Sequence, residues 1–224
     1  MKPDEIIQRR VARELKPNSL VNLGIGLPTG VARYIDEHAN VLFESENGIV
    51  GLAAKPPEGM DDPDLTDAGG GTVSAVPGAA TIDSAYSFGL IRGGHLDATV
   101  LGALEVDERG MLANWVVPGK MVPGMGGAMD LVTGARRVIV AMNHTAKGAP
   151  KIVPKCTLPL TSIRRISLIV TDMAVIEPTD AGLVLRERAP GVTVEQIVAA
   201  TSAKLIVEGE VPEMDLGVPA AAAA

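Results

Sequence analysis

The sequence predicts an α/β fold: a single domain with a mainly parallel β-sheet flanked by helices. Short apolar runs of strand length alternate with glycine turns and with a few segments of helical periodicity. The 224 residues supply ample material for one large core, and no internal repeat is present. We expect the domain to span residues 1–209 and a flexible, low-complexity tail to occupy residues 210–224.

The first part of the chain alternates between helix and strand patterns. Residues 3–16 have apolar side chains near helical spacing, which predicts an amphipathic helix. Residues 19–26 form a short apolar run that ends in a glycine turn. Residues 28–38 begin with a proline, which suits the first turn of a helix. A second strand is expected at residues 41–45.

Residues 55–72 form an acidic loop rich in proline and glycine. A connection of this length usually has a role, so we expect a flap or a binding loop. Beyond it, a helix is expected at residues 193–203. The expected strands are the apolar runs at residues 97–107, 138–143, 165–177 and 204–207.

The composition excludes several functional classes. The formal net charge is −7 and no basic stripe is present, which argues against nucleic acid as a partner. No apolar run reaches the roughly 18 residues that a membrane helix needs, so we expect no membrane partner. The N-terminal segment mixes both charge signs, unlike a signal peptide, and Cys156 has no second cysteine to pair with. A cytoplasmic location is therefore expected.

Metal and hydrolase chemistry lack their sequence signatures. His38, His95 and His144 are isolated from one another and do not have the spacing of metal ligands. No G-x-S-x-G elbow occurs, which disfavours a serine hydrolase. We expect neither a metal nor a cofactor.

Two carboxylates stand at the end of the strand expected at residues 41–45. Glu44 and Glu46 of "FESENG" are two positions apart, so their side chains point to the same side of a strand. Mutual repulsion raises the cost of ionising both if they are buried. From spacing alone, a solvated strand end and a catalytic carboxylate both remain open.

Two glycine-rich segments are candidate ligand loops. "NLGIGLP" (residues 22–28) places glycines at a strand-to-helix junction, where N–H groups can face an anion, but its spacing does not match the dinucleotide fingerprint. A tight turn explains it equally well. "PGKMVPGMGGAMD" (residues 118–130) suits close backbone approach to a ligand. Within it, the adjacent N–H groups of Gly126 and Gly127 are candidates to stabilise an oxyanion; an irregular loop is the alternative.

Five segments together resemble the β subunit of the family I coenzyme A transferases. They are "NLGIGLPT", "SENGIVG", "SFGLIRGGHLDATVLGALEVD", "LANWVVPGKMVPGMGGAMDLV" and "KCTLPLT", in unbroken order over roughly residues 3–207. The resemblance implies the coenzyme A transferase fold, a nucleophile at Glu46 and oxyanion contacts from Gly127. It implies contacts with coenzyme A or substrate from the other motif residues, Asn22, Gly24, Gly26, Asn47, Gly48, Gly124 and Gly126.

The resemblance also implies a reaction and a partner. Coenzyme A would move between an acyl-CoA (succinyl-, acetyl- or butyryl-CoA) and a 3-oxo acid such as acetoacetate, in ping-pong fashion through a glutamyl-CoA thioester. Coenzyme A is then a substrate, not a cofactor. Because the chain matches only the β half of the family, we expect a separate α subunit in an α2β2 or similar assembly.

Other functions remain open, and two positions depart from the family pattern. The alternatives are a 3-oxoadipate transferase subunit, an acyl-CoA hydrolase that uses the same glutamate, and a non-catalytic subunit that binds coenzyme A. Relatives usually have Gln or His in place of Glu44, and many have Lys or Gln in place of Gly70. The added charge of Glu44 is expected to raise the pKa of Glu46 or to alter which acids are accepted.

Overall fold

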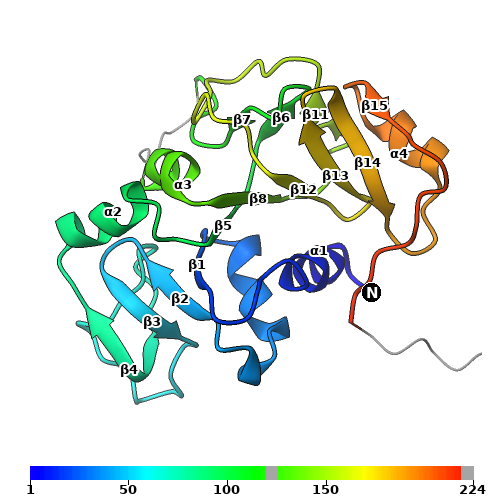
Figure 1. Ribbon diagram of the computed structural model, residues 1–224. Helices are drawn as coiled ribbons and strands as arrows, with labels where there is room; N and C mark the ends of the chain where they lie inside the picture. Colours follow the sequence, from blue (N-terminus) through cyan, green and yellow to red (C-terminus); the bar gives the residue numbers. More distant parts are fainter. Residues whose placement is uncertain (120–125, 218–224) are drawn as a thin grey trace, which may run out of the picture.

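The computed structural model describes residues 1–119 and 126–217. A ten-stranded β-sheet runs through the molecule in the order β15-β14-β13-β12-β8-β5-β1-β2-β3-β4 (Figure 1). Its central strands run parallel to one another: β2 (Leu42–Ser45), β1 (Leu20–Leu23), β5 (Ala98–Leu101), β8 (Arg137–Ala141) and β12 (Leu168–Val170). This confirms the predicted α/β fold with a mainly parallel sheet, whose carboxyl strand ends share one edge.

Antiparallel strands extend the parallel centre at both ends. Next to β2 are β3 (Ile49–Ala53) and β4 (Ser74–Thr81). Next to β12 are β13 (Ala174–Thr179), β14 (Gly182–Arg188) and finally β15 (Leu205–Ile206), which is parallel to β14. One small sheet contains β6 (Glu105–Asp107), β7 (Leu112–Ala113) and β11 (Ile152–Val153). A second contains β9 (Thr145–Ala146) and β10 (Ala149–Pro150).

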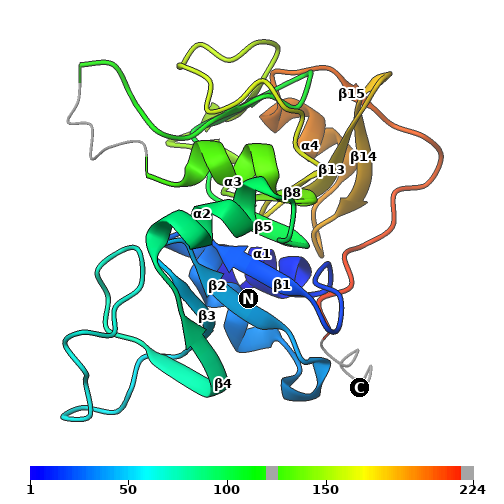
Figure 2. The same cartoon turned by 60° about the vertical axis from the view of Figure 1, so that its left-hand side comes forward.

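Helices cover both faces of the sheet (Figures 1 and 2). On one face, α1 (Pro3–Ala12) packs on β8 and β12, and the 3-10 helix η1 (Leu27–Tyr34) packs on α1 and β1. On the other face, α3 (Ala128–Gly134) packs on β5 beside α2 (Ser84–Arg92). The remaining helices are α4 (Val194–Ala200) and the short 3-10 helix η2 (Glu37–Ala39). Within the described residues, no helix has the length and apolar character that crossing a bilayer requires.

The central strands contribute to two separate cores. On β8, Ile139 packs in the same cluster as Ile7 of α1, whereas the next residue, Val140, packs in the cluster of Leu131 of α3. All four side chains are buried. Since successive strand residues point to opposite faces, this alternation places the α1 and α3 layers on opposite sides of the sheet.

The helix expected at residues 28–38 is instead the 3-10 helix η1, which ends at Tyr34. Gly30 of η1 lies against the Gln8 side chain of α1, and an added Cβ would lie 2.1 Å from Nε2 of Gln8. That amide donates a hydrogen bond to the Leu27 carbonyl over 3.1 Å. A side chain at position 30 would therefore force the end of the Gln8 side chain to move and break this hydrogen bond, a constraint that local periodicity does not reveal.

Two expected strands are each divided. Residues 165–177 form β12, a turn and β13, because Oγ1 of Thr171 accepts hydrogen bonds from the N–H groups of Met173 and Ala174 at 3.1 and 2.9 Å. Such side-chain bonds to the backbone reverse a chain. Residues 97–107 likewise separate into β5 and β6, which belong to different sheets.

The chain beyond residue 209 packs on the domain, unlike the expected flexible tail. Val211, Met214 and Leu216 are buried, and the Met214 N–H donates to the Arg188 carbonyl over 2.9 Å. These apolar side chains complete the sheet end near β14, which explains the difference. Residues 218–224 of the predicted tail lie outside the described residues.

Candidate active site

Glu46 lies in the tight turn between β2 and β3, at the carboxyl end of a parallel strand. Gly48 makes this turn possible: its φ is +119°, and an added Cβ would lie 2.0 Å from the Ile82 carbonyl oxygen. The Gly48 N–H donates to the Ser45 carbonyl and the Gly48 carbonyl accepts from the Ile82 N–H, both over 2.8 Å. The structure thus gives Gly48 a backbone role that fixes the position of Glu46. Ligands commonly bind at this edge of α/β sheets.

Asn22 holds both carboxylates of the motif. It lies on β1 directly beside Glu44 in the parallel register. Its Nδ2 lies 3.0 Å from Oε2 of Glu44 and 3.1 Å from Oε2 of Glu46. The prediction that the two glutamates share one side is confirmed. Asn22 was predicted to contact coenzyme A or substrate; in the structure, its amide binds the glutamates.

Glu44 is buried, with a relative exposure of 2%. The Ser87 hydroxyl of α2 lies 2.9 Å from its Oε1. Burial raises the pKa of Glu44, and the neighbouring charge of Glu46 adds to this rise, while hydrogen bonds from Asn22 and Ser87 oppose it. From the sequence we expected the added charge of Glu44 to act on Glu46. In the structure, the pKa that is raised is that of Glu44, because Glu44 is the buried carboxyl group of the pair.

Gly127 lies against the Glu46 side chain. An added Cβ would lie 3.1 Å from both Cγ and Oε1 of Glu46. The backbone of Gly127 has φ −79° and ψ −2°, which any residue adopts, so a larger residue here is opposed by the space beside Glu46 and not by backbone conformation. Gly126 precedes it with φ +53°. Gly124 lies outside the described residues.

A pocket of about 660 Å³ opens beside Glu46. The two glycines of the "NLGIG" turn, Gly24 and Gly26, line this pocket, and their contact with coenzyme A or substrate stays a prediction. The Gly24 N–H is not available to an anion, since it donates to the Val100 carbonyl over 2.8 Å. At Gly26 the backbone has a φ of +90°, which favours glycine, and an added Cβ would meet nothing within 4 Å.

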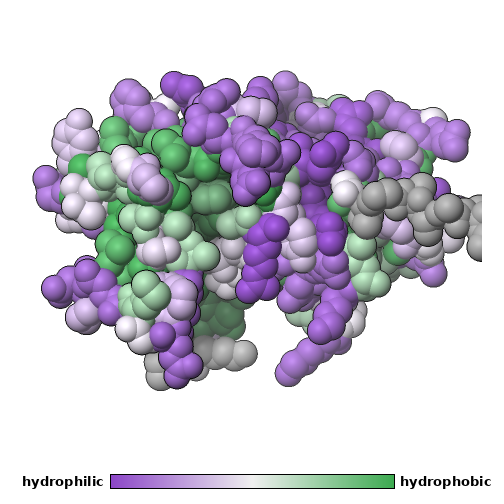
Figure 3. Space-filling view, turned by 90° about the horizontal axis from the view of Figure 1, so that it is seen from below, coloured by the Kyte–Doolittle hydropathy of each residue, from purple (hydrophilic) through white to green (hydrophobic). Residues whose placement is uncertain are grey.

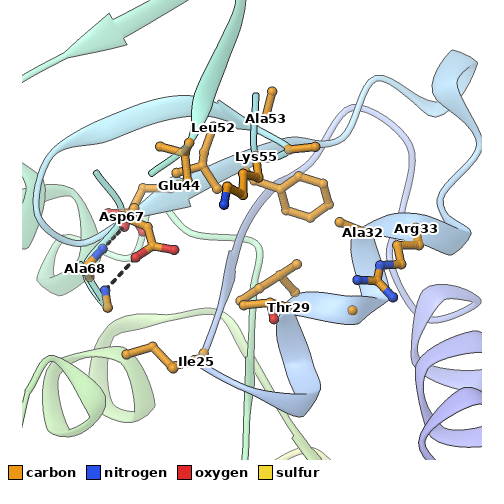
Figure 4. Close-up of a pocket in the computed structure, with 18 of the residues that line it drawn as sticks. Ile25, Thr29, Ala32, Arg33, Glu44, Leu52, Ala53, Lys55, Asp67 and Ala68 are labelled. Atoms are coloured by element: carbon orange, nitrogen blue, oxygen red, sulfur yellow. Dashed lines mark hydrogen bonds between the residues drawn. The ribbon is translucent and has the colours of Figure 1, made fainter. Parts of the chain in front are cut away.

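The loop of residues 55–72 forms another wall of this pocket through Asp67, Ala68 and Gly69 (Figure 4). The carboxylate of Asp67 accepts a hydrogen bond from the Gly69 N–H over 2.8 Å. The Ala68 N–H donates to the Ser45 hydroxyl over 3.0 Å, and Nδ2 of Asn47 donates to the Thr66 carbonyl over 2.7 Å. The loop is thereby tied to the turn that holds Glu46. Its closure over substrate stays a prediction.

Two cations border the same pocket. Figure 4 shows the Lys55 side chain reaching into it from the β3 side, with Arg33 on the η1 side. Neither forms an ion pair with another residue of the described chain. Sequence reasoning missed both, and it missed Ser87, because nothing in the local pattern marks which distant segment will face the strand end.

Comparison with known proteins identifies the family. A family model described as "Coenzyme A transferase" matches residues 4–200. The chain belongs to the coenzyme A transferase family. It is 52% identical over 217 residues to the β subunit of the acetate CoA-transferase of Haemophilus influenzae, covering 96% of this chain and 97% of that one. It is 47% identical over 204 residues to one subunit of the probable succinyl-CoA:3-ketoacid coenzyme A transferase of Bacillus subtilis, covering 91% and 94%.

The solved structure of an acyl-CoA transferase apoenzyme from Escherichia coli O157:H7 has the same fold. It superposes with a TM-score of 0.78 at 22% identity, over 98% of this transferase chain and 45% of that chain. At this identity the likeness supports the fold alone. The relatives named above support the class of this chain, the β subunit of a coenzyme A transferase, as its motifs predicted.

Proposed function

We propose that this chain is the catalytic β subunit of a transferase that moves coenzyme A between an acyl-CoA and a 3-oxo acid such as acetoacetate. Succinyl-, acetyl- and butyryl-CoA are the proposed donors; the names of the relatives support the first two. The observation that carries the proposal is the placement of Glu46. Its carboxylate lies 3.1 Å from the Asn22 amide, against the backbone of Gly127, at a pocket of about 660 Å³.

In the first step, a carboxylate oxygen of Glu46 attacks the thioester carbonyl carbon of the acyl-CoA. A carboxylate needs no general base for this attack. The C–S bond breaks, coenzyme A leaves as a thiolate, and Glu46 and the acyl group form a mixed anhydride. No proton is gained or lost.

In the second step, the thiolate attacks the glutamyl carbonyl of the anhydride. The C–O bond to the bridging oxygen breaks, the first acid leaves as a carboxylate, and coenzyme A remains on Glu46 as a thioester. The acceptor acid then runs both steps in reverse and restores the Glu46 carboxylate. The pocket must keep water away from the anhydride, because hydrolysis would end transfer.

The tetrahedral intermediates carry an oxyanion that backbone donors would stabilise. We assign this role to the N–H groups of Gly127 and Gly126, since Gly127 lies against Glu46. Loss of one such donor costs about 3 kcal/mol in typical cases. Gly26 and Gly24 are assigned to the coenzyme A or substrate wall, together with Asn47 through its loop contact.

An α subunit completes the proposed enzyme, in an α2β2 or similar assembly. The acetate CoA-transferase relatives are named as β subunits, which implies such a partner. Figure 3 shows apolar surface on the side of the molecule that carries β3, β4 and α2. Large apolar side chains near these elements are exposed, among them Ile25 at 72% and Tyr86 at 62%. A partner surface commonly covers such side chains. A cytoplasmic location stays a prediction from the sequence.

Steady-state kinetics of the chain co-purified with its α subunit test this proposal. Transfer from succinyl-CoA to acetoacetate should give parallel double-reciprocal lines, and Glu46→Gln should lower kcat by about a thousandfold or more. Glu58→Gln, in the exposed part of the 55–72 loop, is the matched control and should act as wild type. Release of free acid at the same rate without an acceptor would favour the hydrolase, and full activity of Glu46→Gln would remove Glu46 from the mechanism.

A further inference from the structure

Asn22 has one amide group to serve two carboxylates. Its Nδ2 lies 3.0 Å from Oε2 of Glu44 and 3.1 Å from Oε2 of Glu46, and also 3.3 Å from the Glu44 carbonyl oxygen. An amide nitrogen carries only two hydrogens. Three acceptors therefore compete for two donors, and an ionised Glu44 would compete most strongly with the nucleophile.

The surroundings of Glu44 disfavour a second negative charge. Asn22 on β1, Val50 on β3 and Ser87 on α2 face it, and none of these side chains titrates near neutral pH or carries a positive charge. Among the residues that the structure describes, the one charged group that acts on it is Glu46, which is itself an acid. At 2% exposure, water cannot screen the repulsion.

We propose that Glu44 is a neutral carboxylic acid in the active enzyme. Because it is protonated, Glu44 does not compete for the Asn22 amide, which stays hydrogen-bonded to the Glu46 nucleophile. Glu44 is thus a positioning residue that acts through Asn22. This inference rests on the proposed function, in which Glu46 attacks the thioester. The buried environment also raises the pKa of Glu44, in agreement with the geometry.

The proton has a defined place. Oε1 of Glu44 lies 2.9 Å from the Ser87 hydroxyl oxygen, which accepts a hydrogen bond as well as it donates one. With the acid proton on Oε1, Glu44 donates to Ser87, and Oε2 accepts only a weak bond from Asn22. When the proton leaves, Ser87 turns to donate to Oε1 and Asn22 is drawn to Oε2. The Glu46 carboxylate then loses its donor and gains a charged neighbour.

The test is the pH profile of kcat for the α–β complex from about pH 6 to about pH 10. In wild type, kcat should fall at high pH with the slope of a single ionisation, the alkaline limb of the profile. Glu44→Gln, whose amide reproduces the neutral acid, should keep kcat within about threefold at the wild-type optimum and lack this limb. Ser87→Ala should move the limb to higher pH, because the ionised form of Glu44 loses a donor. Coincident limbs in wild type and Glu44→Gln would overturn the proposal.

Stability supplies a readout that does not depend on catalysis. A carboxyl group whose pKa is higher in the folded protein than in the unfolded chain costs no stability below its unfolded-state pKa. As the pH rises from there through the folded-state pKa, the group progressively lowers the free energy of unfolding. The melting temperature of Glu44→Gln should therefore exceed that of wild type by an amount that grows with pH. A constant difference would refute the neutral acid. Formation of a Glu46–coenzyme A adduct, measured in wild type and in Glu44→Gln, tests the proposed function independently. Absence of the adduct would overturn that function, while the melting temperatures would still decide whether Glu44 is neutral.

Discussion

Nδ2 of Asn22 donates a hydrogen bond to Oε2 of Glu46 over 3.1 Å, although the two residues are 24 positions apart in the chain. The contact exists because β1 and β2 are adjacent parallel strands that end at the same edge of the sheet. It fixes one carboxylate oxygen of the proposed nucleophile. The other oxygen, Oε1, lies on the side of Gly127.

Asn22→Ala should therefore lower kcat more than it affects binding. A hydrogen bond to a charged group contributes about 2 kcal/mol, which corresponds to roughly a thirtyfold loss. Thr99→Val is the matched control, because the Thr99 hydroxyl hydrogen-bonds to Oδ1 of Asn22, at 3.4 Å, and its loss leaves the Asn22 donors in place. Steady-state kinetics of both variants, with melting temperatures, check this. Equal losses of kcat in the two variants would contradict a specific role for the Asn22 amide.

Gly127→Ala should impair the chemical step without straining the backbone. The new methyl group would lie 3.1 Å from Cγ of Glu46 and must displace that side chain. Small displacements of a reacting group cost about a hundredfold in rate. Gly89→Ala on α2, where an added Cβ meets nothing within 4 Å, is the matched control and should keep wild-type kinetics. A Gly127→Ala enzyme with normal kcat would show that the contact is irrelevant to catalysis.

Lys55→Ala should change donor preference. The ammonium group in the pocket can pair with the distal carboxylate of a succinyl group, whereas a butyryl group offers no such partner. For a partly exposed pair we expect about 1 kcal/mol, or roughly a fivefold rise in KM for succinyl-CoA alone. Lys55→Arg should retain most of the preference. Equal effects on both donors would place Lys55 at the coenzyme A moiety instead.

His144 should make the protein sensitive to acid. Its side chain is buried, with the two ring nitrogens 2.9 and 2.8 Å from the hydroxyls of Thr171 and Thr201. Burial lowers the pKa of His144 to about 4. Because the unfolded chain takes up this proton first, the stabilising effect of neutral His144 is present above about pH 6.5 and is lost as the pH falls toward 4.

The loss in unfolding free energy should be about 3 kcal/mol across that window. Urea unfolding of wild type and His144→Gln at several pH values measures it. The variant should be less stable at neutral pH, with a smaller dependence on pH in this range. Parallel pH dependence in the two proteins would show that His144 does not titrate as described.

The sequence was informative where local pattern or motif was sufficient. Strand periodicity correctly put Glu44 and Glu46 on one side. The glycine turn at Gly24 and Gly26 lines a pocket, while its predicted contact with coenzyme A or substrate stays a prediction. The pattern could not show that Ser87, 43 positions after Glu44, would meet that side chain, because tertiary packing brings α2 to the strand end.

Other errors had equally specific causes. The turn at Thr171 was predicted as continuous strand, because its flanks are apolar and the hydrogen bonds of a hydroxyl group leave no periodic signal. The packed segment around Met214 was predicted as tail, because a short apolar segment without periodicity gives no sign of the surface that it covers.

The central claim is that Glu46 becomes covalently attached to coenzyme A. Intact and peptide mass spectrometry of this chain, co-purified with its α subunit and mixed with acetoacetyl-CoA or succinyl-CoA without an acceptor, tests it most directly. We predict a coenzyme A thioester on the peptide that contains Glu46, absent in Glu46→Ala. An intact complex that binds the substrate and yields no adduct on this peptide would contradict the account.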